Sequence, residues 1–298
     1  MTEPGAVVTV GSFDGVHRGH QGVLAEMVRR AGERGLTSVL VTFEPHPLEV
    51  VNPAAAPRLL TLEDEKREIL AQTGVDRLAV LPFTPALAEL GPGDFVRDVL
   101  GARYAMRELV IGYDHGFGRG RSGDVEVVRR LAAAQGFVVH VVDAVRDGGG
   151  PISSRRIRDA VAAGDLAAAA RWLGRPYGLL GRVEPGAGRG RTIGVPTINL
   201  AAPDPKKLLP PDGVYAVRVY WRGTGHGGMM NQGPRPTFGV AARGLEIHLF
   251  DFAGDLYGET VKVEWVRRLR DVRTFASREA LVEQLGRDAS AARESLNL

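Results

Sequence analysis

The sequence predicts an α/β protein whose first part is a doubly wound parallel sheet and whose second part is an antiparallel β-barrel with a terminal helix. In the first half, short apolar runs rich in branched residues alternate with longer amphipathic stretches, which is typical of βαβ units. After Gly174, glycine and proline become frequent and apolar residues alternate with polar ones. That change is typical of short antiparallel strands.

Five strands and four helices are expected in the first half. The strands are expected at residues 6–10, 37–43, 77–81, 109–111 and 137–142. The helices between them are expected at residues 19–33, 62–72, 94–100 and 123–134. The βαβ alternation implies a parallel sheet with helices on both faces, and ligands of such sheets bind at the carboxyl ends of the strands. A site is therefore expected in the loops that begin at Gly11, Glu44 and Gly112.

A helical stretch at residues 153–173 follows, and Gly164 with Asp165 predicts a break within it. Three alternating strands are then expected at residues 214–220, 245–252 and 260–266, which favours a compact antiparallel barrel. The C-terminal residues 277–296 form an amphipathic pattern with Leu281 and Leu285 on one face, so this helix is expected to pack on the barrel. We place the boundary near residue 180, which gives domains 1–180 and 181–298.

The composition is that of an ordinary globular protein. Of 298 residues, 44% are hydrophobic and 24% are charged, which excludes fibrous, collagenous and disordered proteins. No apolar run approaches the roughly 18 residues that a membrane-spanning helix needs, and the start lacks the pattern of a secretory signal. The absence of cysteine excludes disulfides, thiolate metal sites and a cysteine nucleophile. We therefore expect a cytoplasmic protein without a membrane partner.

The basic residues are almost all arginine. The formal net charge is +3, and among 38 basic residues the only lysines are Lys66, Lys206, Lys207 and Lys262. Guanidinium groups suit phosphate oxygens, so an anionic substrate is one explanation of this excess. A genome-wide preference for arginine codons is the other, and the sequence leaves both open.

The first candidate site is Gly-Ser-Phe-Asp-Gly-Val-His-Arg-Gly-His at residues 11–20, between an expected strand and an expected helix. Its histidines, His17 and His20, are three residues apart and so share one face of the first helical turn. The free N–H groups and positive dipole end of that turn favour an anion, and glycines let a phosphate approach the backbone. The alternative is a helix-capping loop whose histidines are solvated.

Three further segments are expected at the same edge of the sheet. They are Thr-Phe-Glu-Pro-His-Pro at residues 42–47, Ile-Gly-Tyr-Asp-His-Gly-Phe-Gly at 111–118, and Ile-Ser-Ser-Arg-Arg-Ile-Arg at 152–158. Taken alone, His46 and Asp114 are ordinary turn residues and Ser153 is an ordinary helix cap. Their joint placement favours a site.

Together these four motifs resemble the adenylyltransferase module of the bacterial bifunctional riboflavin kinase/FMN adenylyltransferases, or FAD synthetases. That module has the Rossmann-like fold of the His-x-Gly-His nucleotidyltransferases. The resemblance implies that His17 and His20 bind ATP phosphates and stabilise the transition state of adenylyl transfer. It also implies further ATP contacts from Gly11, Phe13, Asp14, Gly19, Ser153, Ser154 and Arg158, and flavin contacts from His46 and Asp114.

The chain departs from this family at two positions. Arg155 stands where the family usually has threonine, and His115 stands where it often has an aromatic residue. The departures leave open whether the adenylyltransferase has been altered or lost.

The second candidate site begins with a glycine-rich segment at residues 181–194 that contains three arginines. It is followed by Val-Pro-Thr-Ile-Asn-Leu at residues 195–200. No helix pattern follows the glycines and no Gly-Lys-Ser/Thr ending is present, so neither a dinucleotide fingerprint nor a P-loop is supported. Thr197 and Asn199 are two apart on an extended segment, so both oxygens could reach one Mg²⁺ that also binds nucleotide phosphates. A hydrogen-bonded turn is the alternative.

An alternating strand carries a candidate base. Leu245, Ile247 and Leu249 are expected on one face and Glu246 and His248 on the other. A carboxylate between apolar neighbours could have a raised pKa and accept a proton from a primary hydroxyl. A solvated strand face is the alternative.

Three motifs of the second half resemble, in order, the riboflavin kinase module of the same family. They are Gly-Arg-x-x-Gly-x-Pro-Thr-x-Asn-Leu at residues 190–200, Asn-Gln-Gly-Pro-Arg-Pro-Thr-Phe at 231–238, and Glu-x-His-Leu-x-Asp-Phe at 246–252. The resemblance implies that Thr197 and Asn199 hold Mg²⁺ and that Glu246 activates the ribityl hydroxyl. It further implies ATP contacts from Gly186, Gly188, Arg191 and Gly194, and flavin contacts from Asn231 and Arg235.

The two resemblances cover residues 7 to about 290 and imply an ATP- and Mg²⁺-dependent enzyme. It would phosphorylate riboflavin to FMN and then adenylylate FMN to FAD, releasing pyrophosphate. Riboflavin, FMN, FAD and ATP are the expected partners, without nucleic acid or membrane, and no oligomeric state is predicted. One rival is an enzyme with a single working site. The other is a nucleic-acid-binding protein, against which stand the 6% aromatic content and the lack of basic runs interleaved with stacking residues.

Overall fold

The computed structural model describes residues 5–185, 195–234 and 243–298. The chain divides into two compact units, Met1–Ser154 and Arg155–Leu298, and each is described by itself. Among the described residues, no helix is both long enough and apolar enough to cross a membrane. The predicted site residues Gly186, Gly188, Arg191, Gly194 and Arg235 lie outside the described residues.

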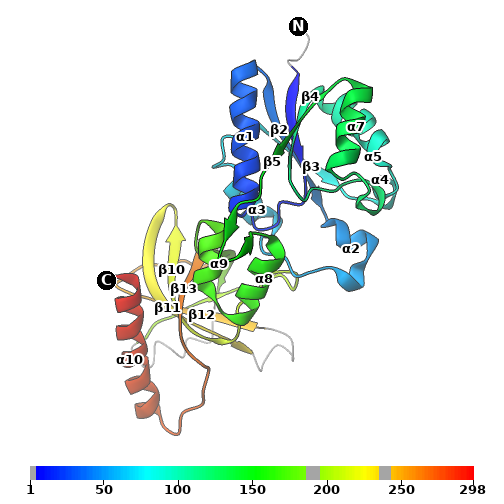
Figure 1. The fold of residues 1–298 in the computed structure, drawn as a ribbon. Coiled ribbons are helices and arrows are strands. Elements are labelled where there is room, and N and C mark those ends of the chain that lie inside the picture. Colours follow the sequence, from blue (N-terminus) through cyan, green and yellow to red (C-terminus); the bar gives the residue numbers. More distant parts are fainter. Residues whose placement is uncertain (1–4, 186–194, 235–242) are drawn as a thin grey trace. The chain divides into compact units, whose positions relative to one another are not determined.

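The first unit is built on a five-stranded sheet with the order β3-β2-β1-β4-β5 (Figure 1). Its strands are β1 (Ala6–Val10), β2 (Thr37–Glu44), β3 (Arg77–Pro82), β4 (Met106–Gly112) and β5 (Val138–Val142). All four neighbouring pairs are parallel. The predicted parallel sheet is therefore confirmed, and its strands end together at one edge.

Helices cover both faces of this sheet, because successive side chains of a strand point to opposite faces. Val7 packs into one apolar cluster with α1 (Arg18–Arg34) and α3 (Glu63–Leu70). Its neighbour Val8 packs into another with η2 (Phe95–Gly101) and α7 (Val125–Gln135). Figure 1 shows α1 and α7 on opposite sides of the strands.

Several short elements complete the first unit. They are α2 (Pro47–Val51), η1 (Pro53–Ala55), α4 (Pro85–Ala88), α5 (Pro92–Asp94), α6 (Ala102–Tyr104), η3 (Arg119–Arg121) and the antiparallel pair β6 (Arg146–Asp147) and β7 (Gly150–Pro151). The sequence analysis did not predict them. They are too short to show an apolar period, and proline opens four of the helical turns.

Two helices, α8 (Ser154–Ala163) and α9 (Leu166–Leu173), follow. The predicted break between them is confirmed: Gly164 adopts a φ of 79°, and the side chain of Asp165 accepts a hydrogen bond from Ala168 N, which caps α9. The division into compact units lies at the start of this helical pair, whereas the boundary expected near residue 180 lies beyond its end.

The second unit contains a closed barrel with the strand order β10-β11-β12-β9-β8-β13. The strands are β8 (Tyr177–Glu184), β9 (Ile198–Leu200), β10 (Gly213–Trp221), β11 (Thr224–Pro234), β12 (Arg243–Leu249) and β13 (Thr260–Arg270). Their pairs are all antiparallel, so the predicted barrel is confirmed.

Three barrel strands were missing from the sequence analysis. The end of β8 occupies residues 181–184, which the sequence assigns to a glycine-rich segment. Strand β9 has only three residues, and β11 contains four glycines that mask its alternation. Gly228 is required by packing, because a Cβ there would lie 2.6 Å from the His248 carbonyl oxygen on β12.

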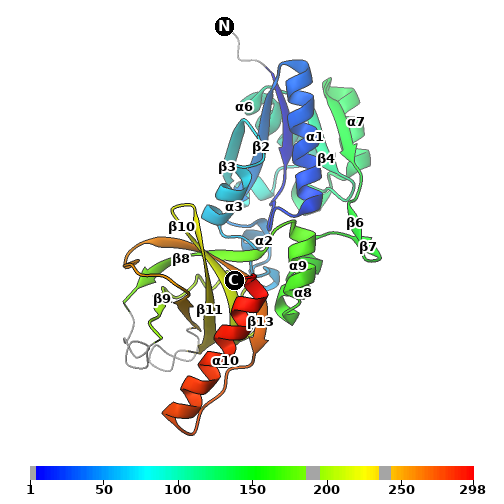
Figure 2. The same ribbon diagram turned by 90° about the vertical axis from the view of Figure 1, so that its left-hand side faces the viewer.

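The terminal helix α10 (Arg278–Leu296) packs on the barrel, as the sequence predicts (Figure 2). Ala292 and Leu296 are buried against barrel residues that include Ala216. A bidentate ion pair also holds the helix: Arg270 of β13 donates from Nε and Nη2 to the Asp288 carboxylate, with the shortest contact at 2.7 Å. Asp288 is buried, so this pair is shielded from solvent.

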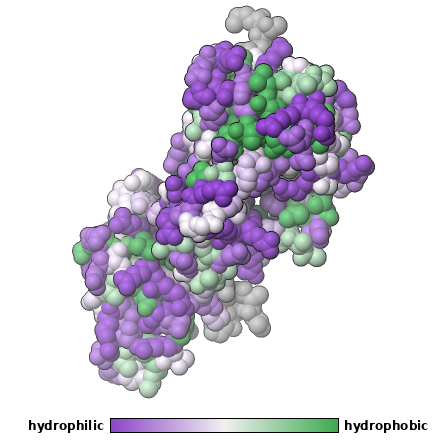
Figure 3. Space-filling view, in the orientation of Figure 1, coloured by the Kyte–Doolittle hydropathy of each residue, from purple (hydrophilic) through white to green (hydrophobic). Residues whose placement is uncertain are grey.

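Many arginines lie on the surface and pair with carboxylates along their own helix. Arg29, for example, contacts Glu26 at 2.7 Å and Glu33 at 2.6 Å. Figure 3 shows hydrophilic residues over most of the visible face of each unit. The arginine excess is therefore used widely for surface pairs, and it does not by itself locate a site.

The Arg270–Asp288 pair generates a stability prediction. Asp288→Ala should lower the free energy of unfolding of the second unit by about 3–5 kcal/mol, because it leaves a largely buried guanidinium without its carboxylate. All three tryptophans, Trp172, Trp221 and Trp265, belong to this unit, so their fluorescence during urea unfolding reports on it.

Glu283→Ala is the matched control, because it removes an exposed partner of Arg287 from the same helix and should cost less than about 1 kcal/mol. Equal losses in the two variants would contradict the importance of the buried pair.

Candidate active sites

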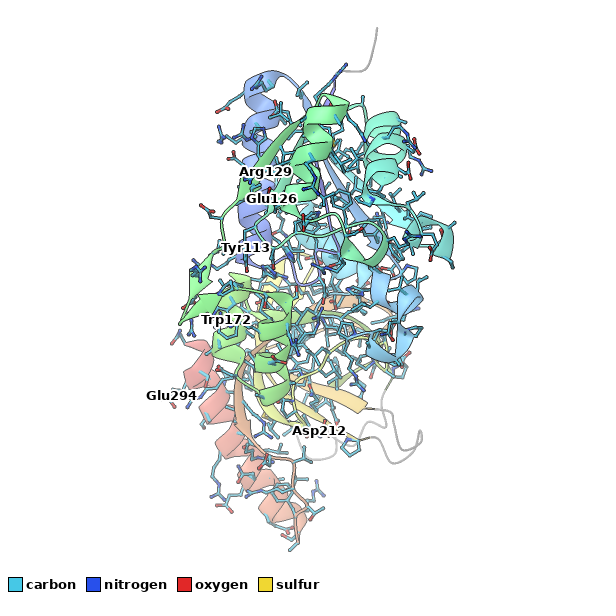
Figure 4. The ribbon with its side chains drawn as sticks, turned by 45° about the vertical axis from the view of Figure 1, so that its right-hand side comes forward. Tyr113, Glu126, Arg129, Trp172, Asp212 and Glu294 are labelled. Atoms are coloured by element: carbon cyan, nitrogen blue, oxygen red, sulfur yellow. The ribbon has the colours of Figure 1, made fainter. Side chains whose placement is uncertain are left out.

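A cavity of about 260 Å³ lies in the first unit at the carboxyl ends of β1, β4 and β5. Its lining includes eight of the predicted site residues, Gly11, Phe13, His17, Gly19, His20, Asp114, Ser153 and Ser154. Tyr113, labelled in Figure 4, marks the loop after β4 that forms another part of the wall. The structure thus brings together three of the four segments expected at this edge.

The two histidines stack on each other at the start of α1. Their ring centroids are 3.6 Å apart, and His17 Nδ1 accepts a hydrogen bond from His20 N at 3.2 Å. Because Nδ1 accepts, neutral His17 carries its proton on Nε2 and can donate it. His20 Nδ1 is buried and has no hydrogen-bond partner among the described residues. A buried polar atom left unpaired in a cavity points to a ligand.

The electrostatics keep His20 neutral. Burial, followed by the neighbouring His17 and then Lys66, lowers the pKa of His20 well below its ordinary value of 6.5. At neutral pH this imidazole therefore offers a lone pair on one nitrogen and an N–H on the other.

The turn between β1 and α1 is strained and is held from outside the cavity. Phe13 and Val16 adopt φ angles of 48° and 40°, which non-glycine residues rarely do. The buried Asp14 carboxylate accepts hydrogen bonds from Leu60 N at 2.9 Å and Thr61 N at 3.0 Å. Asp14 is predicted to bind ATP, but here its carboxylate holds the turn, and Asp14 is absent from the cavity lining.

Three other predicted residues of the first half, Ser154, His46 and Arg158, lie at different positions relative to the cavity. Ser154 Oγ donates to the Asp14 carbonyl at 2.9 Å and so ties the start of α8 to the turn. His46 caps α2, where its Nδ1 accepts from Leu48 N at 3.2 Å, and it does not line the cavity. Arg158 lies on α8 in the second unit, so its contact with ATP stays a prediction.

The loops after β4 and β5 contain polar groups that the sequence did not assign to the site. Arg121 and Asp143 line the cavity, and the Arg121 guanidinium donates to the Asp114 carbonyl at 3.4 Å. His115 also lines it, and its Nε2 is buried without a partner among the described residues. Burial first, and then Arg121, lower the pKa of His115 to about 4. The sequence signal for this residue was that His115 stands where the family often has an aromatic residue.

The second unit holds a cavity of about 500 Å³ between barrel strands and α10. Leu281 and Leu285 of α10 line it, as their shared face predicts. The remaining lining residues are Val195, Thr197, Val214, Met229, Asn231, Glu246, His248, Arg270, Val272, Arg273 and Phe275. Apolar walls with a few polar groups are typical of a site for a small organic molecule.

Strand register brings the predicted polar residues of this unit together. Glu246 on β12 pairs with Asn199 on β9 and, on its other side, with Asn231 on β11. Residues directly opposite in antiparallel strands point to the same face of the sheet. Thr197 Oγ1 donates to Glu246 Oε1 at 2.7 Å. The hydroxyl proton is thus directed to the carboxylate, which leaves the Thr197 lone pairs available to a cation.

The predicted alternation of β12 is confirmed. Leu245 and Ile247 are fully buried, whereas Glu246 and His248 are partly exposed at the cavity. His248 Nδ1 lies 2.7 Å from the Pro196 carbonyl oxygen, and because a carbonyl only accepts, Nδ1 carries the proton. This hydrogen bond, which sequence reasoning missed, fixes the segment that carries Thr197.

The oxygen atoms of Thr197, Asn199 and Glu246 suit a hard divalent cation. Within the described ranges of the chain, no group of three or more histidine, cysteine, aspartate or glutamate side chains could hold a metal ion. A cation at this position would therefore need further ligands, and phosphate oxygens of a bound nucleotide are the natural source.

Comparisons with known proteins now identify the family. Residues 1–156 match the model for FAD synthetase, and residues 173–296 match the model for riboflavin kinase. The bifunctional riboflavin kinase/FMN adenylyltransferase of Pseudomonas fluorescens is 40% identical over 292 residues, which cover 97% of this chain and 92% of that protein. The chain belongs to this bifunctional family. It is thus a transferase that makes FMN from riboflavin and FAD from FMN, and members of the two families use ATP and a divalent metal.

Other relatives agree in length and fold. The bifunctional enzyme of Escherichia coli K12 is 38% identical over 297 residues, covering 99% of this chain and 94% of its own. A crystal structure from Streptococcus pneumoniae, named as that of a macrolide-efflux protein, is 35% identical with a TM-score of 0.88. It covers 98% of this chain and 95% of its own, so a solved structure shares this fold.

The burial of His115 predicts a pH-dependent stability. Between pH 6.5 and about 4 the unfolded chain binds a proton at this imidazole that the folded chain does not. The first unit should therefore lose stability as pH falls through that window, and His115→Phe should reduce the loss. Ring-proton NMR should show a midpoint near pH 4 for His115, with the signal assigned by its disappearance in His115→Phe. A midpoint near 6.5 would contradict the burial argument.

Proposed function

We propose that the two units act in sequence through separate ATP sites. The cavity of the second unit would take riboflavin and the γ-phosphoryl group of ATP, and the cavity of the first unit would take FMN and a second ATP. The observation that carries this proposal is one cavity in each unit, lined by the motifs of the family model that matches there.

The helical pair α8 and α9 lies largely between the two matched models, which end at residue 156 and begin at residue 173. We propose that this pair works with the first module, so that the functional modules are residues 1–180 and 181–298. Support comes from the segment at its start, where Ser153 and Ser154 line the first cavity. Arg158, one turn further along α8, would close over the triphosphate with them.

In the first module, His17 and His20 would hold the ATP phosphates while negative charge develops during adenylyl transfer. His17 accepts a hydrogen bond at Nδ1 and so can donate from Nε2, and His20, whose pKa is lowered, can donate one N–H to a phosphoryl oxygen. The backbone N–H groups at the start of α1 add donors, with Gly11 and Phe13 forming the turn before them. Gly19 leaves room for this arrangement, since a Cβ there would lie 3.1 Å from the His17 ring.

The attacking group is the phosphate of FMN. We propose that Asp114 orients the flavin from the loop after β4 and that His46 contributes from α2. Asp114 lines the cavity, which supports its role. His46 does not line the cavity, so its contact with the flavin is proposed from the family pattern. The proposed part of Asp14 is to hold the turn that carries the histidines, through Leu60 and Thr61.

In the second module, Glu246 would accept the proton of the ribityl hydroxyl as that oxygen attacks the γ-phosphorus. Its carboxylate borders the apolar cavity, where Asn231 would contact the flavin. We propose Mg²⁺ as the divalent metal, held by Thr197 and Asn199. When bound, it would neutralise charge on the ATP phosphates. Gly186, Gly188, Arg191 and Gly194 are proposed for the phosphates and Arg235 for the flavin, from the family pattern alone.

Positioning and charge stabilisation suffice for both steps, so neither needs a covalent intermediate on the protein. Since both steps consume ATP, we propose the cytoplasm as the compartment.

The histidine pair gives the sharpest test of the first module. A variant with both His17→Ala and His20→Ala should lose FAD formation and keep FMN formation, because the second cavity is untouched. Chromatography of flavins after incubation with riboflavin, ATP and Mg²⁺ measures both products. Equal loss of both activities would contradict separate sites.

Glu246 gives the corresponding test of the second module. Glu246→Gln should reduce FMN formation by about 10²-fold or more, because the amide cannot accept the hydroxyl proton. FAD formation from added FMN should stay unchanged. Glu283→Gln, an exposed change on α10, is the control. Near-normal FMN formation in Glu246→Gln would exclude its role as the base.

A further inference from the structure

Lys66, on α3, is a buried cation beneath the turn that bears the two histidines. It is 7% exposed, although lysine is seldom buried without a partner. Its Nζ contacts the Ser12 carbonyl oxygen at 3.3 Å and Thr42 Oγ1 at 3.5 Å, and both contacts are long. Among the described residues, no carboxylate lies within ion-pair distance of it.

The charge of Lys66 is therefore incompletely compensated. Burial lowers its pKa below 10.5, whereas the more distant carboxylates of Glu44, Asp14 and Glu63 oppose that change and Arg67 adds to it. An ammonium that is buried beside two weak acceptors is costly unless an anion approaches it.

The geometry connects this ammonium to the cavity through one residue. The Ser12 carbonyl accepts hydrogen bonds from Lys66 Nζ and, at 3.2 Å, from Thr42 Oγ1. Ser12 itself lines the cavity and precedes the strained Phe13. The Lys66 charge also acts on His20, because it contributes to the lowered pKa of that imidazole.

A lysine at position 66 is unusual for this chain. Only four lysines occur among the 38 basic residues of this chain, so an ammonium at this buried position stands out. A guanidinium is planar and larger, whereas an ammonium is a compact point charge that fits beside a single carbonyl.

We propose that Lys66 is a positioning residue for adenylyl transfer. Its ammonium holds the Ser12 carbonyl and supplies a positive charge that the ATP polyphosphate neutralises. This inference rests on the proposed function of the first module. It assigns to α3 a part in the reaction, although Lys66 does not line the cavity.

Lys66→Met keeps the apolar length of the side chain and removes the charge. The KM for ATP in FAD formation from FMN should rise at least about tenfold, the equivalent of one hydrogen bond to a charged group. Lys66→Arg, which keeps the charge, should restore part of that loss. Arg67→Met is the matched control, since it removes a positive charge from the exposed side of the same helix and should leave the KM unchanged.

A pH profile separates this role from a merely structural one. Because burial lowers the pKa of Lys66, the wild-type chain should lose FAD formation at alkaline pH as the ammonium deprotonates. The groups around it, Glu44, Asp14, Glu63, Arg67 and His20, are all unchanged in Lys66→Arg. That variant should therefore keep its activity to higher pH than the wild type.

Two results would overturn the proposal. One is a folded Lys66→Met, checked by circular dichroism, with an unchanged KM for ATP. The other is an alkaline limit that is the same in Lys66→Arg and wild type, and this result decides the matter if Lys66→Met does not fold. Failure of the proposed function would be seen separately, as FAD formation that survives replacement of His17 and His20.

Discussion

The register of paired strands is the constraint on which both sites depend. In the barrel, antiparallel pairing sets Glu246 between Asn199 and Asn231, so residues far apart in the chain share one face. In the first unit, parallel pairing ends β1, β4 and β5 at one edge, where their loops surround the histidines. A shift of one residue in the barrel register would send Glu246 or its neighbours to the opposite face.

The two proposed sites would treat the charge of ATP differently. The first offers two stacked imidazoles, with the pKa of His20 lowered by burial, a helix N-terminus, and a lysine ammonium behind the turn. The second offers the oxygens of Thr197 and Glu246, already joined by a hydrogen bond, beside an apolar cavity. The first arrangement suits hydrogen bonding to phosphoryl oxygens, and the second suits a divalent cation and a proton acceptor.

Much of this arrangement follows from local sequence patterns. Period-two alternation predicted which side of β12 carries Glu246, and the glycine before Asp165 predicted the break between α8 and α9. Contacts between distant segments escaped prediction. The carboxylate of Asp14 bonds to backbone 46 residues away, and Lys66 approaches Ser12 across 54 residues. No local period encodes such contacts, because they exist only once α3 has packed on the sheet.

The central claim is that two ATP molecules, bound in two separate units, each give a different group to the flavin. Incubation of the intact chain with riboflavin, Mg²⁺ and either γ-³²P- or α-³²P-labelled ATP tests it directly. The account predicts γ-label in both FMN and FAD, and α-label in FAD alone. Label from the α-phosphate in FMN, or FAD without γ-label, would contradict it.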